Sequence, residues 1–482
     1  MITITLINCN QGLLDGPRKI LNKLYNEFEI KHPNAFQIML HQRGRNSWDG
    51  KVHFLTETGK FKIGLLPTIY NRLVELKQKV KVVDKRPPLS VVPSIPKVVG
   101  DKTLRPEQRS SLADILNNKV GGIPFYIGVG DLAVNFGKSL LFAAIYMAFK
   151  KKLKVLLLTN DSDWLSQSKS EFPELIPREE LTFVQGSKVT NWNQFSIGMV
   201  QSISRNIRTY QRELSQIDIV LIDEADIIDN KTYKTVIEHL YNTRIRIGLS
   251  GTIYMSNLKK DLLHNMNIRS FIGDKLTEVK LHQMIKKGYS TPVVVKMVPG
   301  NGQKGVYKDY PTEYEKTITL NRKSYKLSLK RTLMNVGYGR IPALVVTKYI
   351  MHCEELYKFY KKHLKSKYTI RYVHHETKDR DNIMKLFREG KIDILISTTI
   401  ISRGKNFPLL RYLQNCGSMD SNEKTIQLLG RLVRTHESKS KAYLDDIMYQ
   451  GKYLSRHSNH RKNFYKKEKM KVIDLGRKRK KR

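Results

Sequence analysis

Short apolar runs alternate with helical patterns along two long stretches of the chain, and this alternation constrains the fold more than any other feature. In the first stretch the runs are PFYIGVG, KVLLLT, FSIGMV, DIVLID and RIRIGLS; in the second they include PALVVT, TIRYVHH and IDILIST. Strands that are apolar on both faces are typical of parallel sheets covered by helices on both sides. The sequence therefore predicts an α/β protein with two doubly wound parallel-sheet domains in tandem.

Composition divides the chain further. The first 85 residues alternate apolar runs with one helical stretch around PRKILNKLYNEF, as a small α+β module would. Four prolines in the 13 residues of KRPPLSVVPSIPK exclude a helix or a central strand there and indicate a stiff linker. We expect an α+β module at 1–85, a linker at 86–100, a first α/β domain at 101–298, a polar connector at 299–330, a second α/β domain at 331–470 and a basic tail at 471–482.

The charge balance is strongly positive. Of 482 residues, 86 are Lys or Arg and 44 are Asp or Glu, so the formal net charge is 86 − 44 = +42. Such a surplus repels itself unless a polyanion screens it, and nucleic acid is the obvious polyanion. We therefore expect a nucleic acid as the partner, ahead of a membrane surface.

Other features of the composition favour an intracellular protein. The sequence has no stretch of 18 or more apolar residues and no secretory signal pattern. Cys9, Cys353 and Cys416 lie far apart in the sequence and provide neither a disulfide framework nor a metal cluster. The expected location is the cytoplasm, or the host cell cytoplasm if the protein is viral.

The strongest local signal is LAVNFGKSLLFAAIYMAF, which follows the strand-like run PFYIGVG and opens an apolar helix. This strand–loop–helix order is the context of a phosphate-binding loop. Asn135, Phe136 and Gly137 would bring backbone N–H groups to the phosphates. Lys138 would reach the β- and γ-phosphates, and the Ser139 hydroxyl would bind Mg²⁺.

An acidic cluster about 85 residues downstream supplies the partner motif. IDIVLIDEAD is an apolar strand that ends in Asp223 and Glu224. Asp223 is placed to hold Mg²⁺ through water, and Glu224 is the natural base for orienting an attacking water. The loop and the cluster together predict a site that hydrolyses ATP with Mg²⁺.

The order of further motifs resembles that of superfamily 2 helicases and translocases, whose motor consists of two RecA-like domains. In the first block, LRPEQ resembles the entry motif that would place Arg105 and Gln108 near adenine. LLLTNDSDWLSQ resembles motif Ia, which implies that Thr159 lies near the DNA backbone. MVQSIS resembles the element that would add Gln201 and Ser202 to the DNA contacts, and GLSGT resembles motif III.

The second block resembles the same superfamily. ILISTTIISRGKNFP is similar to motif V, which implies DNA contacts by Thr398 and Arg403. QLLGRLVR is similar to motif VI, in which Gln427 would touch the nucleotide and Arg431 and Arg434 would act as arginine fingers. A transferring phosphoryl group needs fixed cations, and fingers from a second domain would couple hydrolysis to closure.

Within the superfamily, the chain resembles the bacteriophage UvsW-type branch-migration helicases. NSWDGKVHFLTETGKFKIGLLPTI looks like their small DNA-binding module, which would give Trp48 and Lys51 a role in DNA binding. His457, Arg461 and Tyr465 resemble their closing segment. A β-hairpin turn around Trp48 is compatible with that role.

The resemblance implies an ATP-dependent DNA helicase or translocase that remodels branched DNA in phage replication and recombination, by branch migration or by processing forks, R-loops or D-loops. Its expected cofactors are ATP and Mg²⁺. Its expected partner is branched or forked duplex DNA, with RNA possible in hybrids, and the expected state is a monomer.

Two departures and several alternatives stand beside this interpretation. Leu132 occupies the first Gly position of the strict phosphate-loop pattern, and Lys405 and Asn406 replace the acid that usually follows Gly in motif V. The Asp-Glu-Ala-Asp tetrapeptide allows an RNA-stimulated DEAD-type helicase, although Ser250-Gly251-Thr252 and QLLGRLVR differ from that family. A double-stranded DNA translocase without strand separation and a non-enzymatic basic packaging protein are further alternatives.

Three remaining features have simpler explanations. His374, His375 and Glu376 have no third ligand at diagnostic spacing, so they predict a strand-to-helix turn. The terminal RKRKKR favours a DNA-binding tail over a nuclear signal. Phe464 and Tyr465 lie among basic residues and would either stack on bases or pack in the core.

Overall fold

The computed structural model of the protein describes residues 1–41, 48–187, 189, 191–253, 259–300, 307–364, 367–402 and 407–476. The chain divides into two compact units, Met1–Leu132 with Gly137–Val279 and Ala133–Phe136 with Lys280–Arg482. Each unit contains its own apolar core. In the described ranges, every helix is too short or too polar to cross a bilayer.

A seven-stranded sheet forms the centre of the first unit, and all its strand pairs are parallel. Its order is β13 (Leu181–Val184), β14 (Phe195–Met199), β12 (Val155–Thr159), β15 (Ile219–Asp223), β16 (Ile245–Ser250), β11 (Ile127–Leu132) and β17 (Lys275–Val279). Every residue of the five strands from β14 to β11 is buried, as the apolar runs predict.

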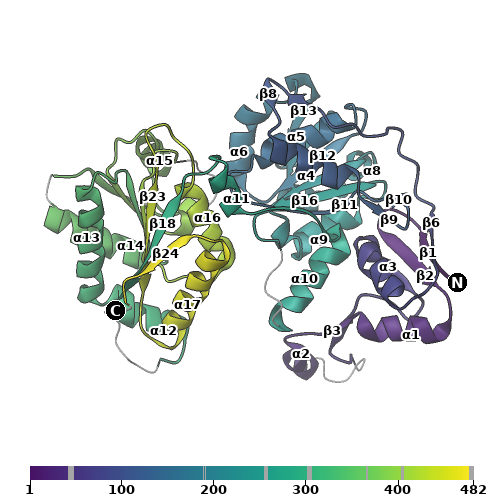
Figure 1. Cartoon of the computed structure of the whole chain (residues 1–482), viewed down its shortest axis with the longest axis horizontal. Helices are drawn as coiled ribbons and strands as arrows, with labels where there is room; N and C mark the ends of the chain where they lie inside the picture. The colour runs from purple at the N-terminus through teal and green to yellow at the C-terminus, as the bar shows by residue number, and fades with distance from the viewer. Residues whose placement is uncertain are drawn as a thin grey trace. The chain divides into compact units, whose positions relative to one another are not determined.

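Helices cover both faces of this sheet. Figure 1 shows α4 (Pro106–Leu116), α5 (Lys138–Ala148) and α6 (Ser162–Glu171) on one face and α9 (Lys231–Glu238) and α10 (Lys259–Ile272) on the other. Two shorter helices, α7 (Val200–Arg205) and α8 (Gln211–Ser215), follow β14. Crossovers between parallel strands are right-handed, so a strand order that reverses direction within the sheet places helices on both faces.

The N-terminal residues form a separate four-stranded sheet in the order β5 (Lys60–Lys62), β2 (Gln11–Asp15), β1 (Ile2–Leu6) and β6 (Val80–Asp84). The helices of this module are α1 (Arg18–Glu27), α2 (Ala35–His41) and α3 (Leu66–Glu75). Further two-stranded pairs are β3 (Glu29–Lys31) with β4 (Lys51–His53), β7 (Val98–Val99) with β8 (Lys102–Thr103), and β9 (Lys119–Val120) with β10 (Ile123–Pro124).

The core of the N-terminal module continues into the first large sheet. Leu65, Ile69 and Leu73 belong to the same apolar cluster as Phe125 and Ile127, and all five side chains are fully buried. Removing the module would expose Phe125 and Ile127 to water, at a cost of about 25 cal/mol per Å² of apolar surface. The module and the sheet therefore fold as neighbours with a shared apolar interior.

Buried polar contacts fasten the module to strand β16. The Arg246 side chain, only 2% exposed, donates to the Cys9 carbonyl oxygen at 2.6 Å and to the Asn10 side chain. Burial lowers the pKa of Arg246 to about 10, which still leaves the group charged at neutral pH. Arg244 ion-pairs with Asp84 at 2.7 Å. A buried guanidinium without these acceptors would be strongly destabilising, so the contacts fix the module to β16.

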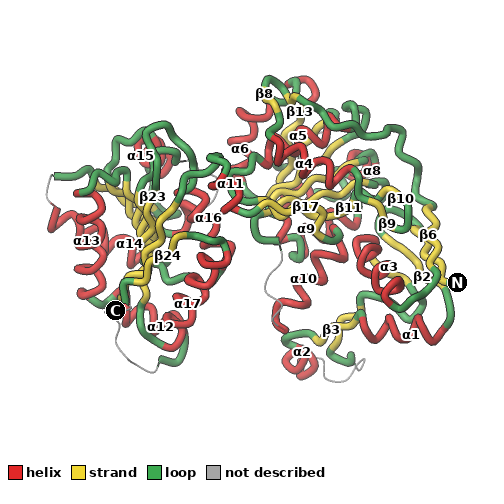
Figure 2. Tube along the Cα trace, viewed as in Figure 1, coloured by secondary structure: helices red, strands yellow, loops and turns green. Residues whose placement is uncertain are grey.

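The proline-rich segment between β6 and β7 contains neither helix nor strand, and Figure 2 draws it as a long loop. It lies on the protein rather than apart from it. Arg86 is 4% exposed and ion-pairs with Asp84, and the Ser94 amide donates to the Ala148 carbonyl at the end of α5. The linker thus follows the surface of the first unit.

The second unit has the same architecture. Its parallel sheet has the order β20 (Ile370–Val373), β21 (Ile394–Ser397), β19 (Ala343–Val346), β22 (Tyr412–Asn415), β23 (Ala442–Met448), β18 (Val293–Pro299) and β24 (Lys471–Asp474). Figure 1 shows α13 (Arg322–Gly337) and α14 (Ile350–Leu364) on one face, and α16 (Asn422–Leu432) and α17 (Lys452–Lys467) on the other. The remaining helices are α11 (Leu281–Lys286), α12 (Tyr310–Tyr314) and α15 (Arg380–Arg388). The two all-parallel sheets confirm the predicted tandem α/β fold.

The expected connector is more structured than its composition suggests. Its described part from residue 307 contains α12, a π-helical turn at Glu315–Thr319 and the start of α13. Tyr314 and Ile318 are fully buried in the core of the second unit. Glu313 and Thr317 are fully buried as well, so this stretch is a helical segment that contributes both apolar and polar side chains to the interior.

The docking of the module predicts that Gly64→Ala destabilises the first unit. A Cβ at Gly64 would lie 2.2 Å from the Arg269 carbonyl oxygen and 2.8 Å from the Gly273 nitrogen, both backbone atoms that cannot rotate away. Overpacking of this kind costs about 1–3 kcal/mol in the free energy of unfolding. Urea denaturation followed by circular dichroism measures it.

Gly337→Ala is the matched control. Gly337 ends helix α13, and a Cβ there would have no described atom within 4 Å. That substitution should be neutral or stabilise by up to about 1 kcal/mol. Equal unfolding free energies for Gly64→Ala and the unmodified protein would contradict the close docking.

Candidate nucleotide-binding site

The phosphate loop lies between the end of β11 and the start of α5. Gly137 precedes the helix with φ +89° and ψ +51°, a left-handed conformation that Gly adopts without strain. Asn135 is also left-handed, with φ +68°. The Leu132 side chain is fully buried at the end of β11, so the residue that departs from the Gly pattern belongs to the sheet rather than to the turn.

Lys138 faces the acidic cluster. Its Nζ lies 3.3 Å from Asp223 Oδ1 at the carboxyl end of β15. Burial acts to lower the pKa of Lys138, but the carboxylates of Asp223 and Glu224 outweigh it, so the pKa is raised. The ammonium is therefore charged and available to a phosphate at every physiological pH.

Glu224 has an unusual backbone conformation, with φ +53° and ψ +57°. Left-handed conformations cost a non-glycine residue free energy, and they concentrate at functional sites. The turn comes directly after β15 and starts the short 3-10 helix Ala225–Ile227. Glu224 was expected to be the base that orients water, and its strained position next to Asp223 agrees with a functional role.

The acidic cluster is joined to the GLSGT segment by a buried hydrogen bond. The Ser250 hydroxyl donates to Asp226 Oδ1 at 2.6 Å, and both side chains are buried. Ser250 Oγ also accepts from the Thr252 amide at 3.2 Å. Asp226 is a site residue not predicted from the sequence, although its place in the Asp-Glu-Ala-Asp tetrapeptide was a signal. The pair connects the end of β15 with the end of β16.

Arg105 and Gln108, expected near adenine, lie beside the phosphate loop. An added Cβ at Gly137 would come within 2.7 Å of Gln108 Nε2 and 3.5 Å of Arg105 NH2. Gln108 is buried at the start of α4, and its Oε1 accepts from the Arg105 amide at 3.0 Å. The structure thus brings LRPEQ and the phosphate loop together.

The residues expected to hold Mg²⁺ have suitable chemistry. Asp223 Oδ1 is buried and, in the described part of the chain, accepts no hydrogen bond of ordinary geometry. Mg²⁺ is a hard cation that prefers carboxylate and hydroxyl oxygens together with substrate phosphates. Asp223 and Ser139, the second residue of α5, offer such oxygens beside the loop that is predicted to bind phosphates.

The predicted DNA-contacting residues of the first unit also serve local structure. Thr159 is 1% exposed, and its Oγ1 accepts from the Asp161 amide at 3.2 Å. Gln201 donates to the Asn160 carbonyl at 3.3 Å, and Ser202 Oγ accepts from the Gly186 amide at 3.0 Å. A DNA contact at Thr159 would therefore come from the backbone; these roles remain predictions.

The predicted recognition residues of the N-terminal module lie at the start of β4, which pairs with β3 across the intervening helix α2 rather than through a β-hairpin turn at Trp48. The Trp48 indole donates to the Lys51 carbonyl at 2.7 Å, and Lys51 forms an ion pair with Glu29. Asp49, His53 and Glu29 place possible metal ligands within 4.8 Å of one another. His53 Nε2 lies 3.0 Å from Asp49 and Lys51 ion-pairs with Glu29, whereas His53 Nδ1 is buried and neither accepts nor donates a hydrogen bond among the described residues.

The predicted residues of the second unit lie at the carboxyl ends of its strands or on α16. Thr398 is 7% exposed after β21, while Arg403, Lys405 and Asn406 lie outside the described residues. Gln427 and Arg431 are half-buried on α16, and Arg434 is half-buried two residues beyond its end. Gln427 and Arg431 are four residues apart and lie on one face of α16, whereas Arg434 follows the end of the helix.

Two family comparisons agree with this geometry. Residues 101–255 match the family described as "Type III restriction enzyme, res subunit", and residues 329–436 match "Helicase conserved C-terminal domain". The chain therefore belongs to the superfamily 2 helicases, with both of their RecA-like motor domains.

Individual relatives are distant. IRC3 of Saccharomyces cerevisiae, whose name is that of an ATP-dependent helicase, is 24% identical over 351 residues, covering 67% of this chain and 48% of IRC3. The ATP-dependent DNA helicase uvsW of Enterobacteria phage T4 is 21% identical over 359 residues, covering 69% of this chain and 67% of uvsW. The chain thus spans about half to two thirds of the length of these relatives.

A solved structure shares the fold. S. cerevisiae Dbp5 bound to RNA and ADP BeF3 aligns with a TM-score of 0.52 at 13% identity, over 77% of this chain and 90% of that chain. At this identity the similarity supports the tandem RecA-like architecture alone.

The loop geometry predicts that Gly137→Ala weakens nucleotide binding. The new methyl group would occupy a left-handed residue and press on Gln108. A combined cost of about 1.4 kcal/mol raises a dissociation constant tenfold, so the affinity for a fluorescent ATP analogue should fall by about tenfold or more. Fluorescence titration measures that affinity.

Gly186→Ala separates strain from crowding in this test. Gly186 has a similar φ of +84°, but a Cβ there would have no described atom within 4 Å. It should destabilise the fold to a similar extent while leaving the affinity unchanged. Equal losses of affinity in both variants would refute the proximity argument.

Proposed function

We propose that the protein is an ATP-dependent DNA helicase or translocase that remodels branched DNA. The observation that carries the proposal is the pairing of Lys138, at the start of a helix behind a left-handed Gly137, with Asp223 at the end of a neighbouring buried strand. A charged lysine, free helix N–H groups and a carboxylate at one sheet edge are the parts that a phosphoryl-transfer site needs.

In this proposal each part of the site has a defined task. The N-terminal amides of α5 and the Lys138 ammonium bind the β- and γ-phosphates. Mg²⁺, when bound by Ser139 and Asp223, neutralises phosphate charge. Glu224 orients the attacking water and accepts its proton. Gln108, held beside Gly137, contacts the base or ribose end of the nucleotide.

Arg431 and Arg434 act on the γ-phosphate in the proposed mechanism. The resemblance of QLLGRLVR to motif VI supports this role, and the two arginines are only three residues apart, so both can act on one group. Guanidinium groups stabilise charge that develops on the transferring phosphoryl group. Because these arginines belong to the second unit, hydrolysis would be coupled to domain closure.

The Asp226–Ser250 hydrogen bond supports a route from the nucleotide to DNA. Ser250 ends β16, and the same strand is fastened to the N-terminal module through Arg246. A structural change at the acidic cluster would therefore be transmitted to β16, the strand that contacts the module. In the proposal, the module holds the DNA while the motor domains move along it.

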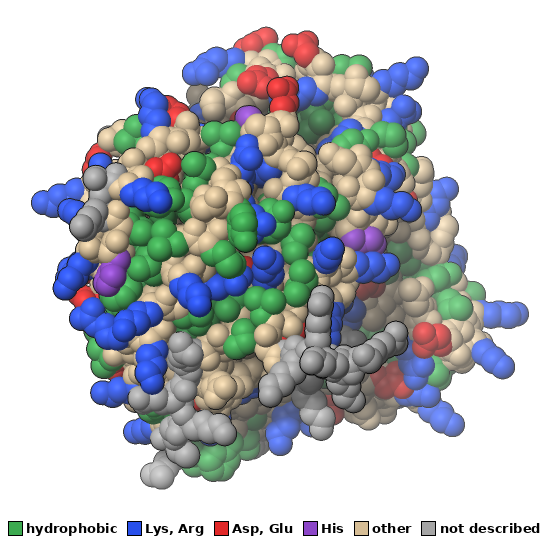
Figure 3. All heavy atoms as spheres, turned by 60° about the vertical axis from the view of Figure 1, so that its left-hand side comes forward, with side chains coloured by type: hydrophobic (Ala, Val, Ile, Leu, Met, Phe, Trp, Pro, Cys, Tyr) green, Lys and Arg blue, Asp and Glu red, His purple; other side chains and the backbone are tan. Residues whose placement is uncertain are grey.

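The charge of the chain supports a polyanionic track. The face in Figure 3 carries Lys and Arg side chains across most of its width, whereas Asp and Glu gather in fewer places. Branch migration suits a motor of this kind, because each step breaks one base pair and forms another. The stacking cost, on average ~1.4 kcal/mol per step, then nearly cancels.

The first test is ATP hydrolysis with and without nucleic acid. Turnover should be low alone, should rise with single-stranded DNA, and should be highest with forked or four-way-junction DNA. Stimulation by RNA alone would favour the DEAD-type alternative. Stimulation by duplex DNA without strand separation would indicate a translocase, and a lack of turnover on every substrate would leave only a binding protein.

Lys138→Ala should lower kcat for ATP by at least about 100-fold, because the transferring phosphate loses a fixed cation. DNA binding, measured by fluorescence anisotropy, should be nearly unchanged. Lys152→Ala removes the same charge from an exposed loop position and serves as the control. Retained turnover in Lys138→Ala would remove the phosphate-loop assignment.

Ser250→Ala should uncouple ATP turnover from DNA remodelling, because Asp226 loses the donor that connects it to β16. We expect strand separation to fall by about tenfold or more while DNA-free turnover changes less than about threefold. Ser270→Ala, which removes another buried hydroxyl in the same unit, is the control. A parallel loss of both activities would show that the bond acts in catalysis or folding alone.

A further inference from the structure

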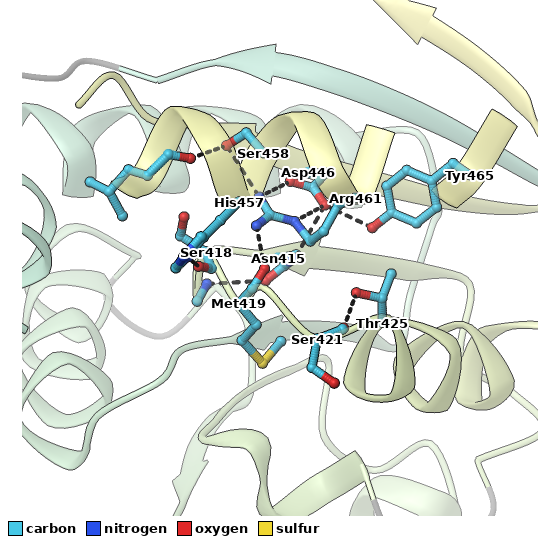
Figure 4. Close-up of polar contacts among 12 residues, drawn as sticks. Asn415, Ser418, Met419, Ser421, Thr425, Asp446, His457, Ser458, Arg461 and Tyr465 are labelled. Atoms are coloured by element: carbon cyan, nitrogen blue, oxygen red, sulfur yellow. Dashed lines mark hydrogen bonds and ion pairs between the residues drawn. The ribbon is translucent and has the colours of Figure 1, made fainter. Parts of the chain in front are cut away.

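Helix α17 contains a buried arginine that neither the nucleotide site nor the predicted DNA contacts use. Arg461 is 0% exposed. Its Nε and NH2 donate to the two carboxylate oxygens of Asp446, at 2.8 Å and 2.7 Å, in a bidentate pair (Figure 4). Its NH1 donates to the Met419 carbonyl at 2.6 Å. One guanidinium thus holds both the end of β23 and the loop after β22.

Neighbouring side chains complete this network. The Tyr465 hydroxyl donates to Asp446 Oδ2 at 2.7 Å, and the Asn415 amide donates to the same oxygen at 3.2 Å. His457 Nδ1 donates to the Ser418 carbonyl at 3.1 Å. Figure 4 shows these groups converging from α17, β23 and the segment 415–421. That segment is therefore held at three points along its length.

The held segment leads directly into α16. Ser421 is the N-cap of this helix, where its Oγ accepts from the Lys424 amide at 3.3 Å. The Thr425 hydroxyl donates back to the Ser421 carbonyl at 2.8 Å. Because α16 starts where the network ends, the network sets the position of the helix that carries Gln427 and Arg431.

The other end of α16 is fixed as well. Lys439 Nζ donates to the Leu432 and Leu410 carbonyls, both at 3.1 Å. Burial lowers the pKa of Lys439 to about 8, yet the amine donates in either protonation state. The Thr291 hydroxyl donates to the Arg434 carbonyl at 2.9 Å. Helix α16 is thus gripped at both termini.

Helix α17 is anchored in turn by Glu313 of α12. This carboxylate is 0% exposed and accepts from the amides of Lys452, Tyr453 and Leu454 at 2.6, 2.8 and 2.9 Å. An anion at a helix N-terminus satisfies free N–H groups and complements the helix dipole. The segment expected to be a connector therefore anchors α17, and α17 in turn positions α16.

A purely stabilising role explains this arrangement poorly. Burying an ion pair costs desolvation free energy, and well-packed apolar side chains of similar volume are often at least as stable. Directed bonds to a carbonyl and a carboxylate do something that apolar side chains cannot, since they fix the loop in one geometry. The chemistry thus favours positioning over stability.

We propose that Arg461, with Asp446 and Tyr465, is a positioning residue that sets α16 so that Arg431 and Arg434 meet the γ-phosphate. This inference rests on the proposed ATP hydrolysis. Loosening the network should slow the chemical step far more than it weakens nucleotide binding, because Lys138 and the acidic cluster have contacts of their own in the first unit.

Tyr465→Phe and Arg461→Lys test the proposal. Tyr465→Phe removes one hydrogen bond without changing shape, and Arg461→Lys keeps the charge but loses the bidentate geometry. A small misplacement of a catalytic group costs up to about 100-fold, so kcat for ATP should fall about 3- to 10-fold and about 30- to 100-fold respectively. The KM for ATP and the affinity for a fluorescent ATP analogue should change by less than about twofold.

Asn463→Ala, at an exposed position of the same helix, is the control and should keep wild-type kcat. Circular dichroism and thermal unfolding establish that each variant folds. Tyr465→Phe keeps the test valid if Arg461→Lys does not fold. A wild-type kcat in a folded Tyr465→Phe and a folded Arg461→Lys would overturn the proposal.

A double-mutant cycle with Arg431→Ala separates positioning from a general structural defect. If the network acts through the two arginines, adding Tyr465→Phe or Arg461→Lys to Arg431→Ala should lower kcat by clearly less than the same change does in the wild type. Additive losses would overturn the proposal. Absence of turnover in the wild type would reject the proposed function itself, whereas a slow Arg431→Ala with fully active network variants would reject only the positioning role.

Discussion

Parallel strands end at a common edge of their sheet, and this constraint places the chemical groups of the first unit. Strand β16 lies between β15 and β11, with Leu249 paired to Asp223 and Ser250 paired to Asp131. The phosphate loop, the acidic cluster and Ser250 therefore emerge side by side, although more than 100 residues separate Lys138 from Ser250. The Lys138–Asp223 ion pair and the Asp226–Ser250 hydrogen bond follow from this adjacency.

The same constraint operates in the second unit with a different result. Asn415 of β22 is paired with Asp446 of β23, so two polar residues meet at neighbouring positions of a buried sheet. Such groups must be satisfied internally. Arg461 and Tyr465 supply the missing donors from α17, and this requirement ties the C-terminal helix to the helix that carries Arg431.

The sequence predicted the two parallel sheets because short apolar runs that alternate with helical patterns are compatible with few other folds. It also predicted that Gly137 and Lys138 lie between a strand and a helix, because the residue types on either side of them favour these elements locally. It did not predict the partners of Arg461 or the burial of Tyr314, because those contacts join residues far apart and depend on helix packing. Leu132 appeared as a departure until its place at the end of a strand was known.

The shared apolar core of the N-terminal module and the first sheet limits which recombined sequences can fold. Because Phe125 and Ile127 pack against Leu65, Ile69 and Leu73, a recombination break near residue 85 would separate halves of one apolar core. Natural exchange of the module between relatives would require compensating changes at these positions. A genetic screen for loss of ATP turnover should therefore find substitutions in the first 85 residues, at positions that do not contact a nucleotide.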